Sequence, residues 1–103
     1  MADQIRIRAQ VQGDIAEIRV LMPHPMETGQ RKDEKGLAVP VHFIQSFTLL
    51  HNGKPLVEGQ LNTSISKNPL FAFRAMGIKP GDRLAVAWTD NLGDKRLDEI
   101  TVS

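Results

Sequence analysis

The sequence predicts an all-β fold, an antiparallel β-sandwich of the immunoglobulin-like type with about seven strands. Two observations predict it: apolar and polar residues alternate with a period of two in segment after segment, and turn signals separate these segments at short intervals. No ten-residue window carries a convincing helical period. The expected strands cover residues 5–10, 16–20, 41–50, 56–61, 70–76, 84–88 and 95–102.

The turns between these segments support the assignment. Gly13 lies in the turn that separates the first two segments, and Asn52-Gly53 is the strongest hairpin signal because both residues tolerate a positive φ. The predicted inward-facing residues are all apolar: Ile5, Ile7, Ile18, Val20, Phe43, Phe47, Phe71, Phe73, Leu84, Val86 and Trp88.

Length and composition set the outer limits of function. The 103 residues form one domain, residues 1–103, without an internal repeat or linker. Thirteen basic and twelve acidic side chains leave a net charge of +1, which excludes the basic signature of a nucleic-acid-binding protein. No apolar run approaches the ~20 residues that span a membrane. The sequence has no cysteine, so it forms no disulfide, thiolate metal site or thiol nucleophile.

The sequence contains no recognisable catalytic constellation. The three histidines show no metal-ligand spacing, and His42 and His51 are predicted to face opposite sides of one strand because their separation is odd. Ser64 and Ser66 lack the context of a hydrolase nucleophile. We therefore expect no catalytic residue, no cofactor and no metal site, and the protein is predicted not to be an enzyme.

The connection from residue 22 to residue 40 is the most unusual segment. It is about twice the length of an ordinary hairpin loop or more. Pro23 and Pro25 stiffen it, and Gly29 supplies permissive geometry at its far end. A simple connector does not need this much side-chain chemistry, and functional residues are often found on such loops.

Met22, His24 and Met26 within this segment suggest one metal-binding alternative. Thioether and imidazole ligands suit Cu(I), and in an extended strand all three side chains would share a face. The intervening prolines favour polyproline geometry, which spreads the side chains around the axis. The alternative function is a free-standing periplasmic β-sandwich binding module, and copper binding through these three residues is one form that it could take.

Five segments in order along the chain resemble the SoxZ family. They are residues 24–29 with 31–33, 40–45, 52–54, 66–69, and 88–91 with 93–94, of which the first (HPMETG, then RKD) is the most specific. SoxZ is the cysteine-free subunit of the SoxYZ sulfur-carrier complex of thiosulfate oxidation. The resemblance implies a non-catalytic subunit that binds SoxY, as a heterodimer or a higher hetero-oligomer. The C-terminal cysteine arm of SoxY carries the covalent sulfur intermediate, and other sulfur-oxidation enzymes contact the complex transiently.

The resemblance also implies a location. The N-terminal residues lack the apolar region of a secretory signal, whereas the pathway is periplasmic. We therefore expect export to the periplasm together with a signal-bearing SoxY partner.

The long loop and the segment 66–69 supply the candidate partner-binding residues. Met26 is expected to be an adaptable apolar contact outside the core, and Arg31 to clamp a partner carboxylate or carbonyl. Two plainer interpretations stay open: Glu27 and Arg31 pair only with each other, and Asn68 before a proline only shapes a turn. The complete predicted partner-binding set is His24, Met26, Glu27, Arg31, Lys67 and Asn68.

Overall fold

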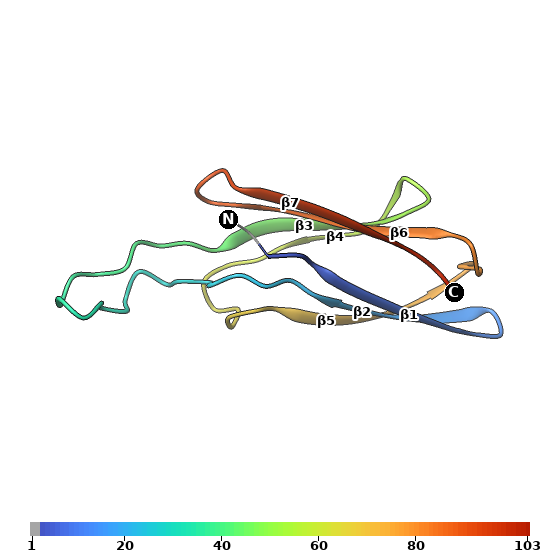
Figure 1. The fold of residues 1–103 in the computed structure, drawn as a ribbon, viewed down its shortest axis with the longest axis horizontal. Coiled ribbons are helices and arrows are strands. Elements are labelled where there is room, and N and C mark those ends of the chain that lie inside the picture. Colours follow the sequence, from blue (N-terminus) through green and yellow to red (C-terminus); the bar gives the residue numbers. More distant parts are fainter. Residues whose placement is uncertain (1–2) are drawn as a thin grey trace.

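The computed structural model describes residues 3–103, which form seven β-strands in two antiparallel sheets (Figure 1). The strands are β1 (Arg6–Gln12), β2 (Ile15–Leu21), β3 (Ile44–His51), β4 (Lys54–Gln60), β5 (Leu70–Met76), β6 (Arg83–Asp90) and β7 (Lys95–Thr101). One sheet has the strand order β1-β2-β5 and the other β4-β3-β6-β7. The predicted all-β sandwich is confirmed. Within residues 3–103 no helix is long and apolar enough to cross a membrane.

The β1-β2-β5 sheet buries one face because its strands alternate. In β2, Ala16, Ile18 and Val20 are buried, and the residues between them are exposed. The antiparallel register places Ile18 opposite Ala9 of β1 and Phe73 of β5. The inner row of side chains is therefore continuous across this sheet.

The β4-β3-β6-β7 sheet contains the expected hairpin. Asn52 and Gly53 connect β3 to β4 with φ angles of 50° and 84°, the positive values that the Asn-Gly pair predicts. In β6, Leu84, Val86 and Trp88 face the other sheet and are almost fully buried, as predicted.

The start of β3 differs from the prediction. The strand begins at Ile44 rather than at residue 41, and its register with β6 shifts between Ile44 and Ser46. A bulge of this kind changes which side chains face inward. As a result Ile44, Phe47 and Leu49 are buried, whereas Phe43 is only partly buried.

The core lies between the two sheets. Phe71 and Phe73 lie opposite the buried Val20 and Ile18 on the inward face, as predicted, and like Phe43 they are partly buried and pack against the core. The buried members are Ile5, Ile7, Ala16, Ile18, Val20, Met22, Met26, Ile44, Phe47, Leu49, Ile78, Leu84, Val86, Trp88 and Val102.

The long connection forms a two-armed extension of the sandwich. Residues 22–43 leave the end of β2, project beyond both sheets and return to β3 (Figure 1). Backbone hydrogen bonds join the arms at Glu27 and His42, with N···O distances of 2.6 and 3.0 Å, and the Val39 amide donates to the Arg31 carbonyl at 2.7 Å. The molecule is correspondingly elongated, with principal extents of 53 × 21 × 19 Å.

Candidate functional site

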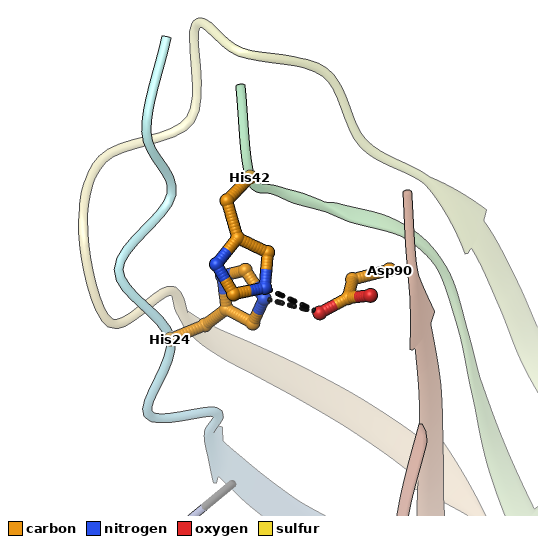
Figure 2. A group of neighbouring side chains, drawn as sticks. All are labelled: His24, His42 and Asp90. Carbon is orange, nitrogen blue, oxygen red and sulfur yellow. Dashed lines mark hydrogen bonds and ion pairs between the residues drawn. The ribbon is translucent and has the colours of Figure 1, made fainter. Parts of the chain in front are cut away.

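A polar cluster lies where the two-armed loop joins the sandwich. The Nε2 atoms of His24 and His42 both lie at hydrogen-bond distance from one oxygen, Oδ2 of Asp90, at 3.0 and 2.7 Å (Figure 2). The side chains of His24 and Asp90 are almost completely buried, and that of His42 is 29% exposed. The two imidazoles meet edge to face with ring centroids 4.5 Å apart. We call His24, His42 and Asp90 the histidine–aspartate cluster.

His24 is held by the segment that precedes β5. Its amide donates to Oδ1 of Asn68 at 3.0 Å, and the Asn68 amide donates to the His24 carbonyl at 3.0 Å. The Met22 amide donates to the Pro69 carbonyl at 2.9 Å, so the pairing of β2 with β5 continues past the strand ends. Asn68 adopts a left-handed φ of 54°, which asparagine tolerates better than most residues.

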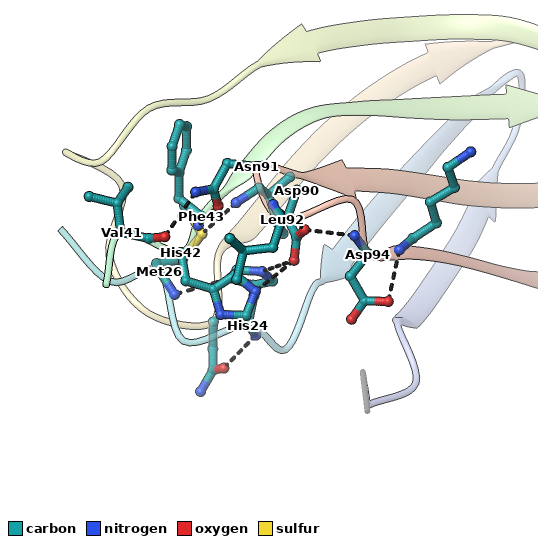
Figure 3. A network of polar contacts seen from close by, with 12 residues as sticks. His24, Met26, Val41, His42, Phe43, Asp90, Asn91, Leu92 and Asp94 are labelled. Atoms are coloured by element: carbon teal, nitrogen blue, oxygen red, sulfur yellow. Dashed lines mark hydrogen bonds and ion pairs between the residues drawn. The ribbon is translucent and has the colours of Figure 1, made fainter. Parts of the chain in front are cut away.

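His42 is positioned by the turn between β6 and β7. The Phe43 amide donates to Oδ1 of Asn91 at 2.8 Å, and Nδ2 of Asn91 donates to the Val41 carbonyl at 2.8 Å (Figure 3). The Asn91 amide group thus binds the backbone on both sides of His42. This clamp extends the contact between β3 and β6 beyond the bulge.

Asp90 is anchored through its other oxygen. Its Oδ1 accepts the amides of Leu92 and Asp94 at 3.0 and 2.9 Å, which closes the tight turn after β6. Burial raises the pKa of Asp90, but the hydrogen bonds from His24 and His42 and those from the turn backbone outweigh it and leave the pKa below its ordinary value. Asp90 is therefore an anion inside the protein.

Met26 determines the tautomer of His24. The Met26 amide donates to Nδ1 of His24 at 3.1 Å, so this nitrogen carries no proton and a neutral His24 must carry its proton on Nε2, towards Asp90. The geometry depends on a positive φ of 49° at Met26, which is unusual for a residue other than glycine. The Met26 sulfur in turn lies 3.3 Å from the Ile44 amide, which donates to it.

A cavity opens beside the cluster. Its volume is about 380 Å³. Trp88 forms part of its wall and packs edge to face against His24, with centroids 5.1 Å apart. The lining residues are Asp3, Pro23, His24, Pro25, His42, Lys67, Asn68, Trp88 and Asp94. The cavity therefore brings the predicted residues His24, Lys67 and Asn68 together.

The expectation that Met26 lies outside the core is wrong, and His24 on the same loop is buried as well. Both are 5% exposed, and Met26 belongs to the hydrophobic core. The local backbone explains this, because the left-handed turn at Met26 directs its side chain towards Ile44. Neither side chain is a free contact surface in this structure, and partner binding by this set stays a prediction.

Glu27 and Arg31 pair with each other on the loop. The guanidinium donates through Nε to both carboxylate oxygens, at 3.1 and 3.0 Å, and through Nη2 to Oε2 at 2.7 Å. This hydrogen bonding lowers the pKa of Glu27 and raises that of Arg31. The plainer interpretation, a pair that ties the loop to itself, therefore describes the observed contact. The Arg31 side chain is still 61% exposed.

The structure argues against a copper site at Met22, His24 and Met26. Met22 is fully buried in the core, and the Met26 sulfur accepts the Ile44 amide, so neither thioether is available beside the His24 ring. These three side chains therefore have separate environments.

Sequence reasoning missed His42 and Asp90 as members of the cluster. Histidine spacing gave no signal because His24 and His42 are brought together by the return of a long loop, not by one strand. The available signal was that a histidine lies near each end of this loop. Asp90 stands at the end of β6, just before the turn whose Asn91 clamps the returning arm.

Comparisons with known proteins give a family and a fold. The family model described as "Sulphur oxidation protein SoxZ" matches residues 5–101. No curated protein matched the chain in sequence. Similar solved structures include hypothetical protein PH1083 from Pyrococcus horikoshii OT3, with 19% identity and a TM-score of 0.70, and a superoxide reductase in the oxidized state, with 19% identity and a TM-score of 0.67. Each alignment covers 99% of this chain and 89% of the other. At this identity the two structures show a shared fold alone.

Proposed function

Because this chain belongs to the SoxZ family of sulfur-oxidation proteins, we propose that it is the non-catalytic subunit of a SoxYZ sulfur-carrier complex. In this complex it binds SoxY, and the C-terminal cysteine arm of SoxY carries the covalent sulfur intermediate. The observation that carries the proposal is the family match over residues 5–101, nearly the whole chain.

The chemistry of the chain favours a subunit that assists the sulfur carrier over one that carries sulfur itself. The sequence has no cysteine, and thiol–disulfide exchange requires a thiolate. A cysteine-free subunit offers no second thiolate that could divert a persulfide from the SoxY arm. Incubation of the isolated chain with thiosulfate or polysulfide should accordingly leave its intact mass unchanged.

The loop end of the molecule has groups that suit a partner protein. Exposed apolar side chains occur on the loop at Leu37 (63%) and on the neighbouring β6–β7 turn at Leu92 (63%). Exposed Arg31 lies on the same loop, and Lys67 lines the cavity beside the histidine–aspartate cluster. Apolar anchors surrounded by charged groups are typical of protein interfaces.

Co-expression with SoxY tests the proposal. We expect one complex on size-exclusion chromatography that contains both chains, and weaker association when Leu37 and Leu92 are changed together to Asp. A matched double variant at the exposed positions Ile15 and Met76, which pair at the end of the β2–β5 ladder far from the loop, should retain the complex. If the two wild-type chains elute separately at micromolar concentration, the proposal is wrong. If only the variant at Ile15 and Met76 dissociates, SoxY binds elsewhere on the domain.

The periplasm is the proposed location. In the family, SoxY carries the export signal and SoxZ crosses the membrane with it. Fractionation of cells that express the chain with and without SoxY tests this: it should reach the periplasm only when SoxY is present.

A further inference from the structure

The histidine–aspartate cluster has the composition and geometry of a metal site. The three side chains each offer one ligand atom, and these atoms all lie within 4.8 Å of one another. They come from the outgoing arm of the loop, from its returning arm and from the end of β6 (Figure 2). We propose that His24, His42 and Asp90 bind a divalent transition-metal ion such as Zn²⁺.

The ligand types fit this class of ion. Imidazole nitrogen and carboxylate oxygen are the usual non-thiolate ligands of Zn²⁺, and three protein ligands leave a further position open. A carboxylate ligand such as that of Asp90 also offsets part of the charge of a divalent ion. In a tetrahedral site the ligand atoms are separated by about 3.4 Å. The observed Nε2···Oδ2 distances of 3.0 and 2.7 Å therefore need to widen by about 0.4 and 0.7 Å.

The surroundings also suit an ion. His24 and Asp90 are held by hydrogen bonds with Asn68 and with the Leu92 amide, whereas His42 is 29% exposed and borders the cavity, so the cluster is rigid on one side and reachable on the other. Such fixation of ligands by neighbouring groups is general in metal sites.

The hydrogen bond from the Met26 amide to His24 opposes metal binding and so limits the affinity for the ion. A metal ion on Nε2 displaces the proton there, and a neutral imidazole must then carry that proton on Nδ1. Nδ1 of His24 accepts the Met26 amide, so this hydrogen bond has to be given up. The strained φ of 49° at Met26 can relax when it is released. Ion binding and the conformation of the loop base are therefore coupled.

The single tryptophan gives a direct assay. Trp88 is the only tryptophan of the chain, and its ring lies 5.1 Å from that of His24. Titration of the tag-free chain with Co²⁺ should quench its fluorescence in a saturable way at one ion per chain, and Zn²⁺ should reverse the quenching. In long-range ¹H–¹⁵N spectra of the Zn²⁺ form, the imidazole nitrogens of His24 and His42 should shift.

Matched variants separate this site from adventitious binding. His42→Ala should weaken binding by at least about 10-fold. His51→Ala removes a histidine that contacts a single aspartate at the other end of the sheet, and it should leave the affinity unchanged within about twofold. Absence of saturable quenching overturns the proposal, as does equal quenching of wild type and His42→Ala. Imidazole shifts at His51 instead of His24 and His42 overturn it as well. None of these results depends on SoxY.

Discussion

Two histidine–aspartate contacts lie at opposite ends of the β3–β6 pair, and their difference is instructive. At the loop end, two histidines share one oxygen of the fully buried Asp90. At the other end, His51 contacts Asp82 at 2.8 Å, with side chains 23% and 21% exposed. Both aspartates also accept turn amides. The same chemistry is therefore present twice, but only at the loop end is the aspartate side chain completely buried.

Replacement of the two aspartates should give the largest contrast. In Asp90→Asn, an amide N–H₂ group or a neutral oxygen would face two imidazole donors in the interior. Breaking a buried, charged contact of this kind costs about 3–5 kcal/mol. Asp82→Asn should destabilise the protein clearly less, because water can replace the lost acceptor. Urea unfolding of both variants measures the difference, and equal losses would show that burial does not distinguish the two ends.

Met26→Ala sharpens the comparison at the buried end. Truncating a buried methionine costs about 2–5 kcal/mol. This replaces the expectation from the sequence that the loop motif lies outside the core. Met76, which is 71% exposed on β5, provides the control. Thermal and urea unfolding should show a large loss for Met26→Ala and almost none for Met76→Ala; comparable losses would contradict the assignment of Met26 to the core.

The exposed His51–Asp82 contact should contribute to the pH dependence of stability in acid. The hydrogen bond from His51 and that from the Lys79 amide lower the pKa of Asp82 from 3.8 to about 2. A carboxyl group with a depressed pKa stabilises the folded state above its unfolded pKa, and this contribution is lost as the pH falls through the folded value. Wild-type stability should therefore decline between about pH 4 and pH 2 in part through Asp82.

Urea unfolding at several pH values from 5 to 2 measures this decline. Asp82→Asn should flatten the slope in this range, whereas Asp14→Asn, at a solvent-exposed turn, should follow the wild-type curve. Parallel curves for wild type and Asp82→Asn would mean that Asp82 has no depressed pKa.

The sequence predicted the fold well because alternation and turn chemistry are local. The seven strands and the Asn52-Gly53 hairpin follow from short windows of residues. The bulge after Ile44 and the observed start of β3 do not follow from such windows, because both depend on pairing with β6 and on the hydrogen bonds from Asn91. The partial burial of Phe43 has the same origin.

The candidate site was harder to predict because it is built across the fold. His24 and Lys67 were selected from their segments, and the structure places both at one cavity. Asp90 and His42 were not selected, since nothing within their own strands indicates that they meet. The burial of Met26 depends on one left-handed residue, which neither periodicity nor hydrophobicity reveals.

Arg31→Ala should have the smallest effect on stability and the most informative effect on function. Arg31 is 61% exposed and pairs with Glu27 through three hydrogen bonds within the loop, so its loss should change the melting temperature by no more than about 4 °C. Arg83→Ala is the matched control, because Arg83 is 70% exposed and only 3.9 Å from Glu99 on the sheet. If the loop binds SoxY, Arg31→Ala should lower the affinity for SoxY by about 10-fold or more, and Arg83→Ala should not. Isothermal titration calorimetry and melting curves on the same samples separate the two effects. If Arg31→Ala and Arg83→Ala bind SoxY with equal affinity, the Glu27–Arg31 pair only shapes the loop, and Arg31 is not a partner-binding residue.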